Sequence, residues 1–161
     1  MKGRLIPYTK PIGFNNNNNF HKLNENGLNK AYNNLNKIHV QGDTMYIAGT
    51  SNLKDVYDDI TKIPFFGTIT DSTRYNQAKT ALDLNPNITK IVGHSLGGSV
   101  ALEFQKNNPK YNTTTYGAPV LQIGSKQGNR FRFPYDPVSY LDNGAITVDK
   151  INFNPHSYSN Y

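Results

Sequence analysis

The chain has 161 residues, a net charge of +6 at pH 7 and no cysteine. This length favours a single domain, and the lack of cysteine excludes disulfides and thiolate metal sites. The N-terminal segment lacks the continuous apolar core of a signal peptide, and no run of about 20 apolar residues is present to span a bilayer. We therefore expect a soluble protein without a signal peptide or a transmembrane segment.

Residues 1–20 are expected to form an irregular, basic, asparagine-rich leader. Two prolines and the run of asparagines from Asn15 to Asn19 offer no periodic apolar face. Residues 1–40 carry six basic side chains and one acidic side chain, so an anionic membrane surface would attract this part of the chain. A solvated, flexible leader is nevertheless the favoured interpretation, and a function of the basic arm at such a surface is the alternative. The folded domain is then expected to span residues 21–161.

Beyond the leader, helical and strand patterns alternate. A turn at Gln41-Gly42-Asp43 separates two predicted strands, and Asp71 or Ser72 is expected to cap a later helix. In chain order we expect a helix at 21–36, strands on either side of that turn (the second at 45–49), a helical pattern at 53–60, a loop at 61–72, helices at 73–84 and 97–107, and strands at 88–92, 113–116, 130–133 and 145–153. This alternation predicts an α/β fold with a mainly parallel central sheet and helices on both faces.

The segment KIVGHSLGGSVAL contains the pattern G-x-S-x-G at Gly93 to Gly97, between a predicted strand and a predicted helix. In a sharp turn of this kind, Gly93 and Gly97 keep Cβ atoms from colliding, and Gly98 lets the helix pack closely on the strand. The N–H groups that open the helix face the reacting centre, where they favour negative charge. The pattern alone is weak, but in this context it predicts that Ser95 is a nucleophile.

A nucleophilic serine needs a base, and four histidines are available. His156 follows the last predicted strand, where the Ser…Asp…His order of α/β-hydrolases puts the base. His94 adjoins the serine and is expected to pack beside the turn. His39 falls in an early predicted strand, and His21 borders the asparagine run. His156 is therefore the favoured base, and a surface histidine is its alternative role.

Three aspartates lie between the serine and His156 and are candidates for the orienting acid. Asp136 stands at the C-terminal end of a predicted strand, where open α/β sheets place functional groups. Asp142 belongs to a turn signature, Asp142-Asn143-Gly144, which explains it without catalysis. Asp149 falls within a predicted strand and is expected to face solvent. Asp136 is therefore the favoured acid.

With these residues, the chain resembles the class 3 lipases, the fungal-lipase-like branch of the α/β-hydrolases, over most of residues 38–161. The matching segments are YIAGTS (Tyr46 to Ser51), GHSLGGSVAL (Gly93 to Leu102), TYGAP (Thr115 to Pro119) and YDPVSYL (Tyr135 to Leu141). The resemblance implies a minimal α/β-hydrolase fold with Ser95 as nucleophile, Asp136 as orienting acid and His156 as general base.

The resemblance also implies an oxyanion hole and a lid. The backbone N–H of Thr50, with its hydroxyl, would join the N–H of Leu96 in the oxyanion hole. The segment after Asp59 would correspond to the lid, with Phe65 and Phe66 as lipid-facing candidates; a place in the core is the alternative for this pair. The chain departs from the family in having Ala48 before the oxyanion Gly-Thr pair, where the family usually has an arginine.

These motifs predict a serine carboxylic-ester hydrolase that acts on lipid, as a triacylglycerol lipase or a phospholipase A, through an acyl-enzyme on Ser95. The basic leader favours action at an anionic membrane surface. The asparagine-rich composition indicates AT-rich coding and would suit a virus, among other sources. The alternative function is a non-catalytic hydrolase-fold module that binds lipid or a protein partner. We expect no cofactor, metal site or nucleic-acid partner, because the histidines are scattered and basic residues do not alternate with aromatic ones.

Overall fold

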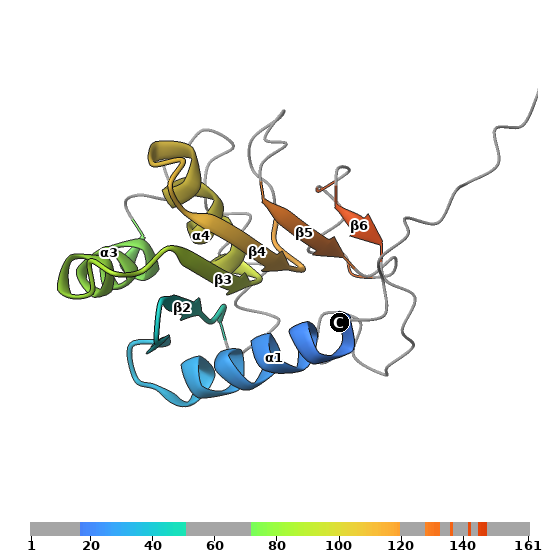
Figure 1. Ribbon diagram of the computed structural model, residues 1–161, viewed down its shortest axis with the longest axis horizontal. Helices are drawn as coiled ribbons and strands as arrows, with labels where there is room; N and C mark the ends of the chain where they lie inside the picture. Colours follow the sequence, from blue (N-terminus) through green and yellow to red (C-terminus); the bar gives the residue numbers. More distant parts are fainter. Residues whose placement is uncertain are drawn as a thin grey trace, which may run out of the picture.

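The computed structural model describes residues 17–50, 72–119, 128–132, 136, 142 and 145–147 (Figure 1). In these ranges six strands form one sheet in chain order, in which β1 runs antiparallel to β2 and every other neighbouring pair is parallel. The strands are β1 (Ile38–Gln41), β2 (Thr44–Ile47), β3 (Lys90–His94), β4 (Asn112–Tyr116), β5 (Asn129–Arg132) and β6 (Ile146–Thr147). The predicted α/β class with a mainly parallel sheet is confirmed.

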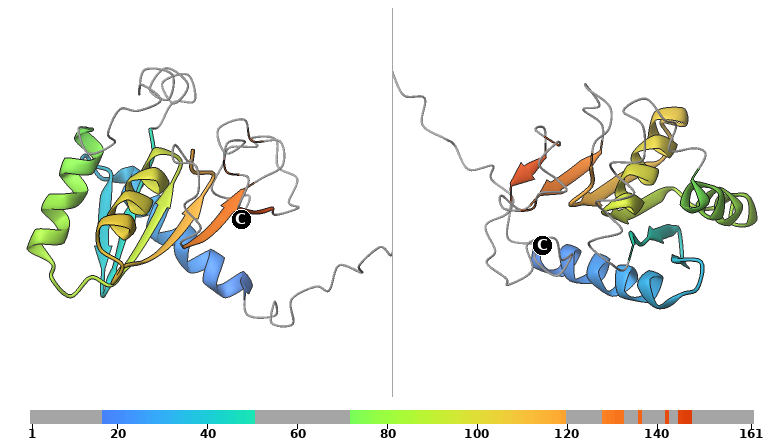
Figure 2. Two further views of the ribbon diagram at one scale, coloured as in Figure 1. Left: turned by 90° about the horizontal axis from the view of Figure 1, so that it is seen from above. Right: turned by 180° about the vertical axis from the view of Figure 1, so that it is seen from behind.

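Helices cover both faces of this sheet (Figures 1 and 2). Helix α1 (Asn17–Asn33) packs on one face, whereas α3 (Thr73–Leu84) and α4 (Leu96–Asn107) lie on the other. Side chains of the central strands alternate between the two layers: Met45 and Ile91 join the core under α3 and α4, and Tyr46 and Val92 join the core under α1. Burial on both faces explains why these strands are largely apolar runs rather than strictly alternating ones.

Helix α1 begins at Asn17 rather than at His21, so three asparagines of the run are helical and the predicted boundary at residue 20 does not coincide with the start of the first helix. The contacts that anchor this helix lie further along it. Leu28 and Ala31 are fully buried against the sheet, and the Asn24 amide donates a hydrogen bond of 2.8 Å to the hydroxyl of Tyr116. Such tertiary contacts override the weak helix propensity of asparagine.

The helical pattern at 21–36 predicts one apolar face made by Leu23, Leu28, Tyr32 and Leu35, and this prediction is only partly confirmed. Leu28 is buried, but Leu23 and Leu35 are 55% and 103% exposed. Leu35 lies beyond the last residue of α1, so it does not continue the helical face.

Most other predicted elements agree with the structure. Helix α3 has its predicted bounds, and its N-cap is Ser72, whose hydroxyl accepts a hydrogen bond of 3.1 Å from the backbone N–H of Tyr75. The β1–β2 hairpin turns at Gly42, which has a φ of +61°. The predicted helix at 53–60, most of the loop at 61–72 and strand residues 148–153 lie outside the described residues.

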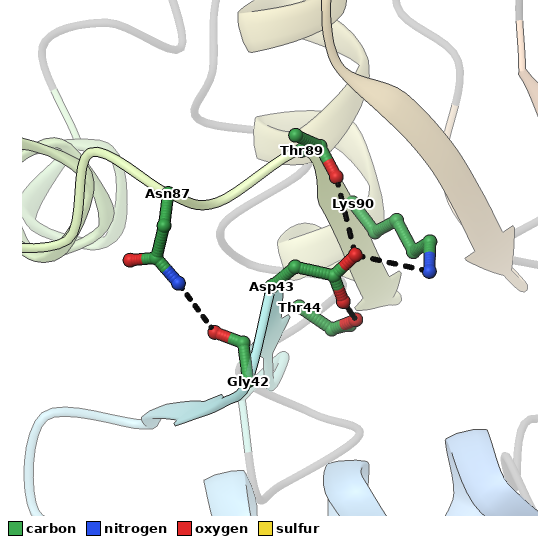
Figure 3. A network of polar contacts seen from close by, with 6 residues as sticks. All are labelled: Gly42, Asp43, Thr44, Asn87, Thr89 and Lys90. Carbon is green, nitrogen blue, oxygen red and sulfur yellow. Dashed lines mark hydrogen bonds and ion pairs between the residues drawn. The ribbon is translucent and has the colours of Figure 1, made fainter.

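A polar network fastens the hairpin to the start of β3, at the end of the sheet where the parallel strands begin (Figure 3). The carboxylate of Asp43 accepts hydrogen bonds from Lys90 Nζ at 3.1 Å, Thr44 Oγ1 at 3.1 Å and Thr89 Oγ1 at 3.4 Å. Its backbone carbonyl accepts from the N–H groups of Thr89 and Lys90 at 3.0 and 3.1 Å. These bonds help to set the register of β2 against β3. That register determines which residues lie side by side where the two strands end, at the opposite, carboxyl edge of the sheet.

Candidate functional site

Ser95 follows β3 directly and is the N-cap residue of α4. Its φ of 54° and ψ of −127° place it in a backbone region that residues with a side chain rarely adopt. Holding a residue there costs about 1–3 kcal/mol, and such strain clusters at active sites. The Ser95 N–H donates to the carbonyl of Tyr116 at 2.9 Å, which ties the turn to the end of β4.

The neighbouring glycines are required by close backbone approach. A Cβ on Gly93 would lie 2.3 Å from the carbonyl oxygen of Gly97, and a Cβ on Gly97 would lie 2.2 Å from the carbonyl oxygen of Ile47. A Cβ on Gly98 would lie 2.6 Å from the Cβ of Ala118. The turn therefore lies against the ends of both β2 and β4, and Ser95 is held at the carboxyl edge of the sheet.

Gly49 and Thr50 lie beside the serine at this edge. The register of β2 and β3 pairs Ile47 with Gly93, so Gly49 is level with Ser95. A Cβ on Gly49 would be 2.7 Å from the Cβ of Ser95. The structure thus brings the predicted oxyanion segment next to the predicted nucleophile. Leu96 is the first residue of α4. Its N–H therefore has no acceptor within the helix, because the carbonyl four residues earlier does not belong to the helix.

Three buried hydroxyls in this region, Ser95 Oγ, Thr50 Oγ1 and Thr115 Oγ1, have no hydrogen-bond partner among the described residues. Buried polar atoms in folded proteins are nearly always satisfied, so each exception calls for an explanation.

His94 has a packing role, as predicted. It is buried, and its Nδ1 lies 2.6 Å from the hydroxyl of Tyr32 on α1. The same hydroxyl accepts a hydrogen bond of 3.1 Å from the N–H of Gly49. Since the N–H supplies a proton to the Tyr32 oxygen, the phenolic hydrogen is available for His94 Nδ1. This network joins α1 to both segments of the site.

The two other described histidines are engaged elsewhere. His21 Nδ1 lies 2.9 Å from the hydroxyl of Tyr116, and its ring packs edge-on against Phe131 with centroids 4.9 Å apart. Burial raises the pKa of the Tyr116 phenol well above its usual range, so this group stays protonated. His39 stacks on Tyr46 in the hairpin, two strands away from β3.

Asp136 and Asp142 are both buried. Asp142 Oδ1 forms an ion pair of 3.0 Å with Arg130 Nη1, and both side chains are at least nine-tenths buried. The turn signature did not reveal this structural role. Asp136 follows β5, whose carboxyl end lies at the same edge as that of β3 and two strands away, or roughly 10 Å across the sheet.

His156, Phe65 and Phe66 lie outside the described residues, so the predicted base and the predicted lipid-facing pair stay predictions. Sequence reasoning missed two residues that contact the site segment, Tyr32 and Arg74. Nη2 of Arg74 donates to the carbonyl of Gly49 at 3.4 Å. No local motif marks either residue, because both contacts join segments far apart in the chain.

Within the described ranges, no three His, Asp or Glu side chains are grouped so that they could hold a metal ion. None of the helices in this part of the chain is both long enough and apolar enough to cross a membrane. No protein-family model, curated protein or solved structure matches the chain.

Proposed function

We propose that the protein is a serine carboxylic-ester hydrolase of the α/β-hydrolase type, acting on lipid through an acyl-enzyme on Ser95. The observation that carries this proposal is the conformation of Ser95. A serine with a φ of 54° and a buried hydroxyl without a described partner, between a parallel strand and a helix N-terminus, is costly to maintain for stability alone. The lipid part of the proposal rests on the resemblance of the GHSLGG, TYGAP and YDPV segments to class 3 lipases.

In the proposed reaction, Ser95 Oγ attacks the ester carbonyl while His156 takes its proton, and Asp136 orients the imidazole. The N–H groups of Leu96 and Thr50 stabilise the negative oxygen of the tetrahedral intermediate. The proton then passes to the departing alcohol, which leaves the acyl group on Ser95. Water, activated by His156, hydrolyses this acyl-enzyme and restores the serine. Removing one oxyanion donor from a site of this kind costs about 10²–10³-fold in kcat.

Covalent labelling tests the nucleophile. The folded chain is incubated with a fluorophosphonate, and the adduct is mapped by peptide mass spectrometry. We expect modification at Ser95, and loss of labelling in Ser95→Ala. Ser99→Ala is the matched control, because Ser99 is also buried in α4 but its hydroxyl already donates to the carbonyl of Pro119. If folded protein gives no Ser95 adduct, the enzyme proposal is wrong, and a non-catalytic module that binds lipid or a protein is favoured.

Substrate class and the base are tested with variants and esters together. Wild type and Ser95→Ala are assayed against p-nitrophenyl esters of increasing chain length, triacylglycerol emulsions and phospholipid vesicles with and without anionic lipid. A preference for short, water-soluble esters over all lipids would contradict the lipid assignment. His156→Ala is expected to abolish turnover, whereas His39→Ala is expected to retain it, since His39 lies in the hairpin at the edge of the sheet.

A further inference from the structure

We infer that Arg74 is a positioning residue for the oxyanion hole: it holds the carbonyl of Gly49 so that the N–H of Thr50 is oriented and polarised as a donor. The inference rests on the proposed function, and it assigns to α3 a part in the reaction that no motif in the sequence indicates.

Arg74 is the second residue of α3, and its guanidinium reaches back to the segment that follows β2. Nη2 donates to the carbonyl of Gly49 at 3.4 Å, and Nη1 donates to the carbonyl of Asn36 at 3.3 Å. Both bonds are long, so each is individually weak, but the planar fork engages two backbone carbonyls at once. Nε is buried and has no partner among the described residues.

The geometry of the peptide group connects this contact to the oxyanion hole. The Gly49 carbonyl and the Thr50 N–H belong to one planar trans peptide, so they point in opposite directions. A cation that holds the carbonyl on one side therefore directs the N–H to the other side. The Gly49 N–H is also held, at 3.1 Å, by the hydroxyl of Tyr32. The two peptide groups on either side of the Gly49 Cα are therefore each held by a hydrogen bond, which restricts rotation of the backbone beside Ser95.

The charge of Arg74 adds a second effect. None of the ion pairs in the described part of the chain involves Arg74, so no described carboxylate neutralises it. Burial lowers the pKa of the guanidinium, and the nearby Tyr32 phenol acts in the opposite direction, but an arginine stays protonated at neutral pH. A cation at the oxygen end of a peptide draws electron density toward that end, which makes the N–H a stronger donor. The same positive charge also favours an oxyanion forming nearby.

The alternative is a purely structural role, in which Arg74 only ties the backbone of Asn36 to that of Gly49. The test must separate this role from the positioning of the oxyanion hole. Thionoesters provide the readout, because the thiolate that develops from C=S accepts hydrogen bonds poorly and gains little from an oxyanion hole. A weakened hole slows the oxygen ester more than the thionoester. General loosening or partial unfolding slows both alike, so the ratio of their kcat/KM values stays constant.

We therefore propose measuring kcat/KM for a matched ester and thionoester on wild type, Arg74→Met and Arg74→Lys, with active sites titrated by fluorophosphonate. Arg74→Met is expected to lower kcat on the ester about tenfold with little change in KM, and to lower the ester-to-thionoester ratio several-fold, because the lost contact acts through one of two donors. Arg74→Lys keeps the charge without the fork, so it is expected to recover part of the ratio. Lys79→Met is the control, because Lys79 lies on the same helix but is exposed, and its ion pair among the described residues is with Asp83.

The outcomes are distinguishable. If wild type labels at Ser95 and hydrolyses esters but both Arg74 variants keep the wild-type ratio, the positioning role is wrong and the proposed function stands. If wild type gives no Ser95 adduct, the proposed function is wrong, and this inference is overturned with it. Titration of active sites keeps the result interpretable if a variant folds only in part, because the ratio refers to the titrated fraction.

Discussion

The hydroxyl of Tyr32 lies 2.6 Å from Nδ1 of His94, although 62 residues separate the two in the chain. It also accepts the N–H of Gly49, so one phenolic oxygen joins α1 to the residue before Ser95 and to the residue before Thr50. The first helix therefore belongs to the support of the site as well as to the core.

Replacing Tyr32 with phenylalanine is expected to lower the free energy of unfolding by about 1–3 kcal/mol, because it leaves a buried N–H and a buried imidazole nitrogen without their partner. Chemical denaturation measures the effect. Tyr75→Phe is the control: Tyr75 stacks on Phe104 with centroids 4.5 Å apart, and its hydroxyl has no hydrogen bond in the described part of the chain. Equal effects of the two substitutions would contradict the network.

The backbone conformation of Ser95 predicts which of two inactive variants, Ser95→Gly and Ser95→Ala, is the more stable. Glycine adopts a φ of 54° without a Cβ penalty, whereas alanine keeps the strain. The unfolded chain gains conformational entropy from glycine, which offsets part of this advantage. Ser95→Gly is therefore expected to be about 1 kcal/mol more stable than Ser95→Ala. Thermal and urea denaturation of both proteins give the comparison. A glycine variant less stable than the alanine variant would show that Ser95 is not strained.

Substitution by asparagine is expected to have different effects at the two buried aspartates: it lowers stability at Asp142 and catalytic activity at Asp136. Asp142→Asn leaves the buried Arg130 without its counter-charge and is expected to cost about 3–5 kcal/mol of stability. Asp136→Asn is expected to fold and to lose about 10⁴-fold in kcat, the loss seen when the acid of a serine triad is made neutral. Denaturation curves and ester hydrolysis measured on the same preparations separate the two roles. An active Asp136→Asn variant would require another acid.

Much of the fold follows from local patterns, and the parts that do not follow depend on distant contacts. The hairpin, the Ser72 cap of α3 and the turn at Ser95 each have a short signature within a few residues, and all three agree with the structure. The start of α1 was misplaced because asparagine is a poor helix former, so the local sequence does not mark residues 17–19 as helical.

The same distinction applies to the site. Ser95 and the neighbouring glycines could be predicted from the sequence, because a sharp turn constrains residues that are adjacent in the chain. Tyr32 and Arg74 could not be predicted in this way. Each contacts Gly49 from a helix, and they are 17 and 25 residues away from it in the chain, respectively. The burial of Asp142 was also hidden, because its turn signature describes the backbone and not the arginine on β5.

Close packing at Gly97 predicts that Gly97→Ala is severely destabilising, by about 3 kcal/mol or more, because the new Cβ would lie 2.2 Å from a backbone carbonyl that cannot rotate away. Gly42→Ala is the matched control. Its φ is +61° but nothing lies within 4 Å, so only the backbone cost of about 1–2 kcal/mol applies. Differential scanning calorimetry distinguishes the two. Equal losses would mean that backbone conformation, and not contact between β2 and α4, decides the need for glycine.

The Asp43 network predicts a pH-dependent contribution to stability at the end of the sheet opposite Ser95. The hydrogen bond from Lys90 is the main cause that lowers the pKa of the Asp43 carboxyl below its ordinary value, followed by the bond from Thr44. A carboxyl whose pKa is lowered on folding contributes stability above its unfolded pKa of about 3.9, and this contribution is lost as the pH falls through the folded value.

Asp43→Asn is therefore expected to lower the urea midpoint at pH 7, and the gap to wild type is expected to close below about pH 4. The effect is expected to be small and to shrink at 1 M salt, because both side chains of the Asp43–Lys90 pair are about half exposed. Asp83→Asn, at the exposed pair with Lys79 on α3, is the control, since that pair does not join two strands. A gap that persists unchanged at pH 3 would show that the Asp43 side chain stabilises the hairpin through its shape and not through its charge.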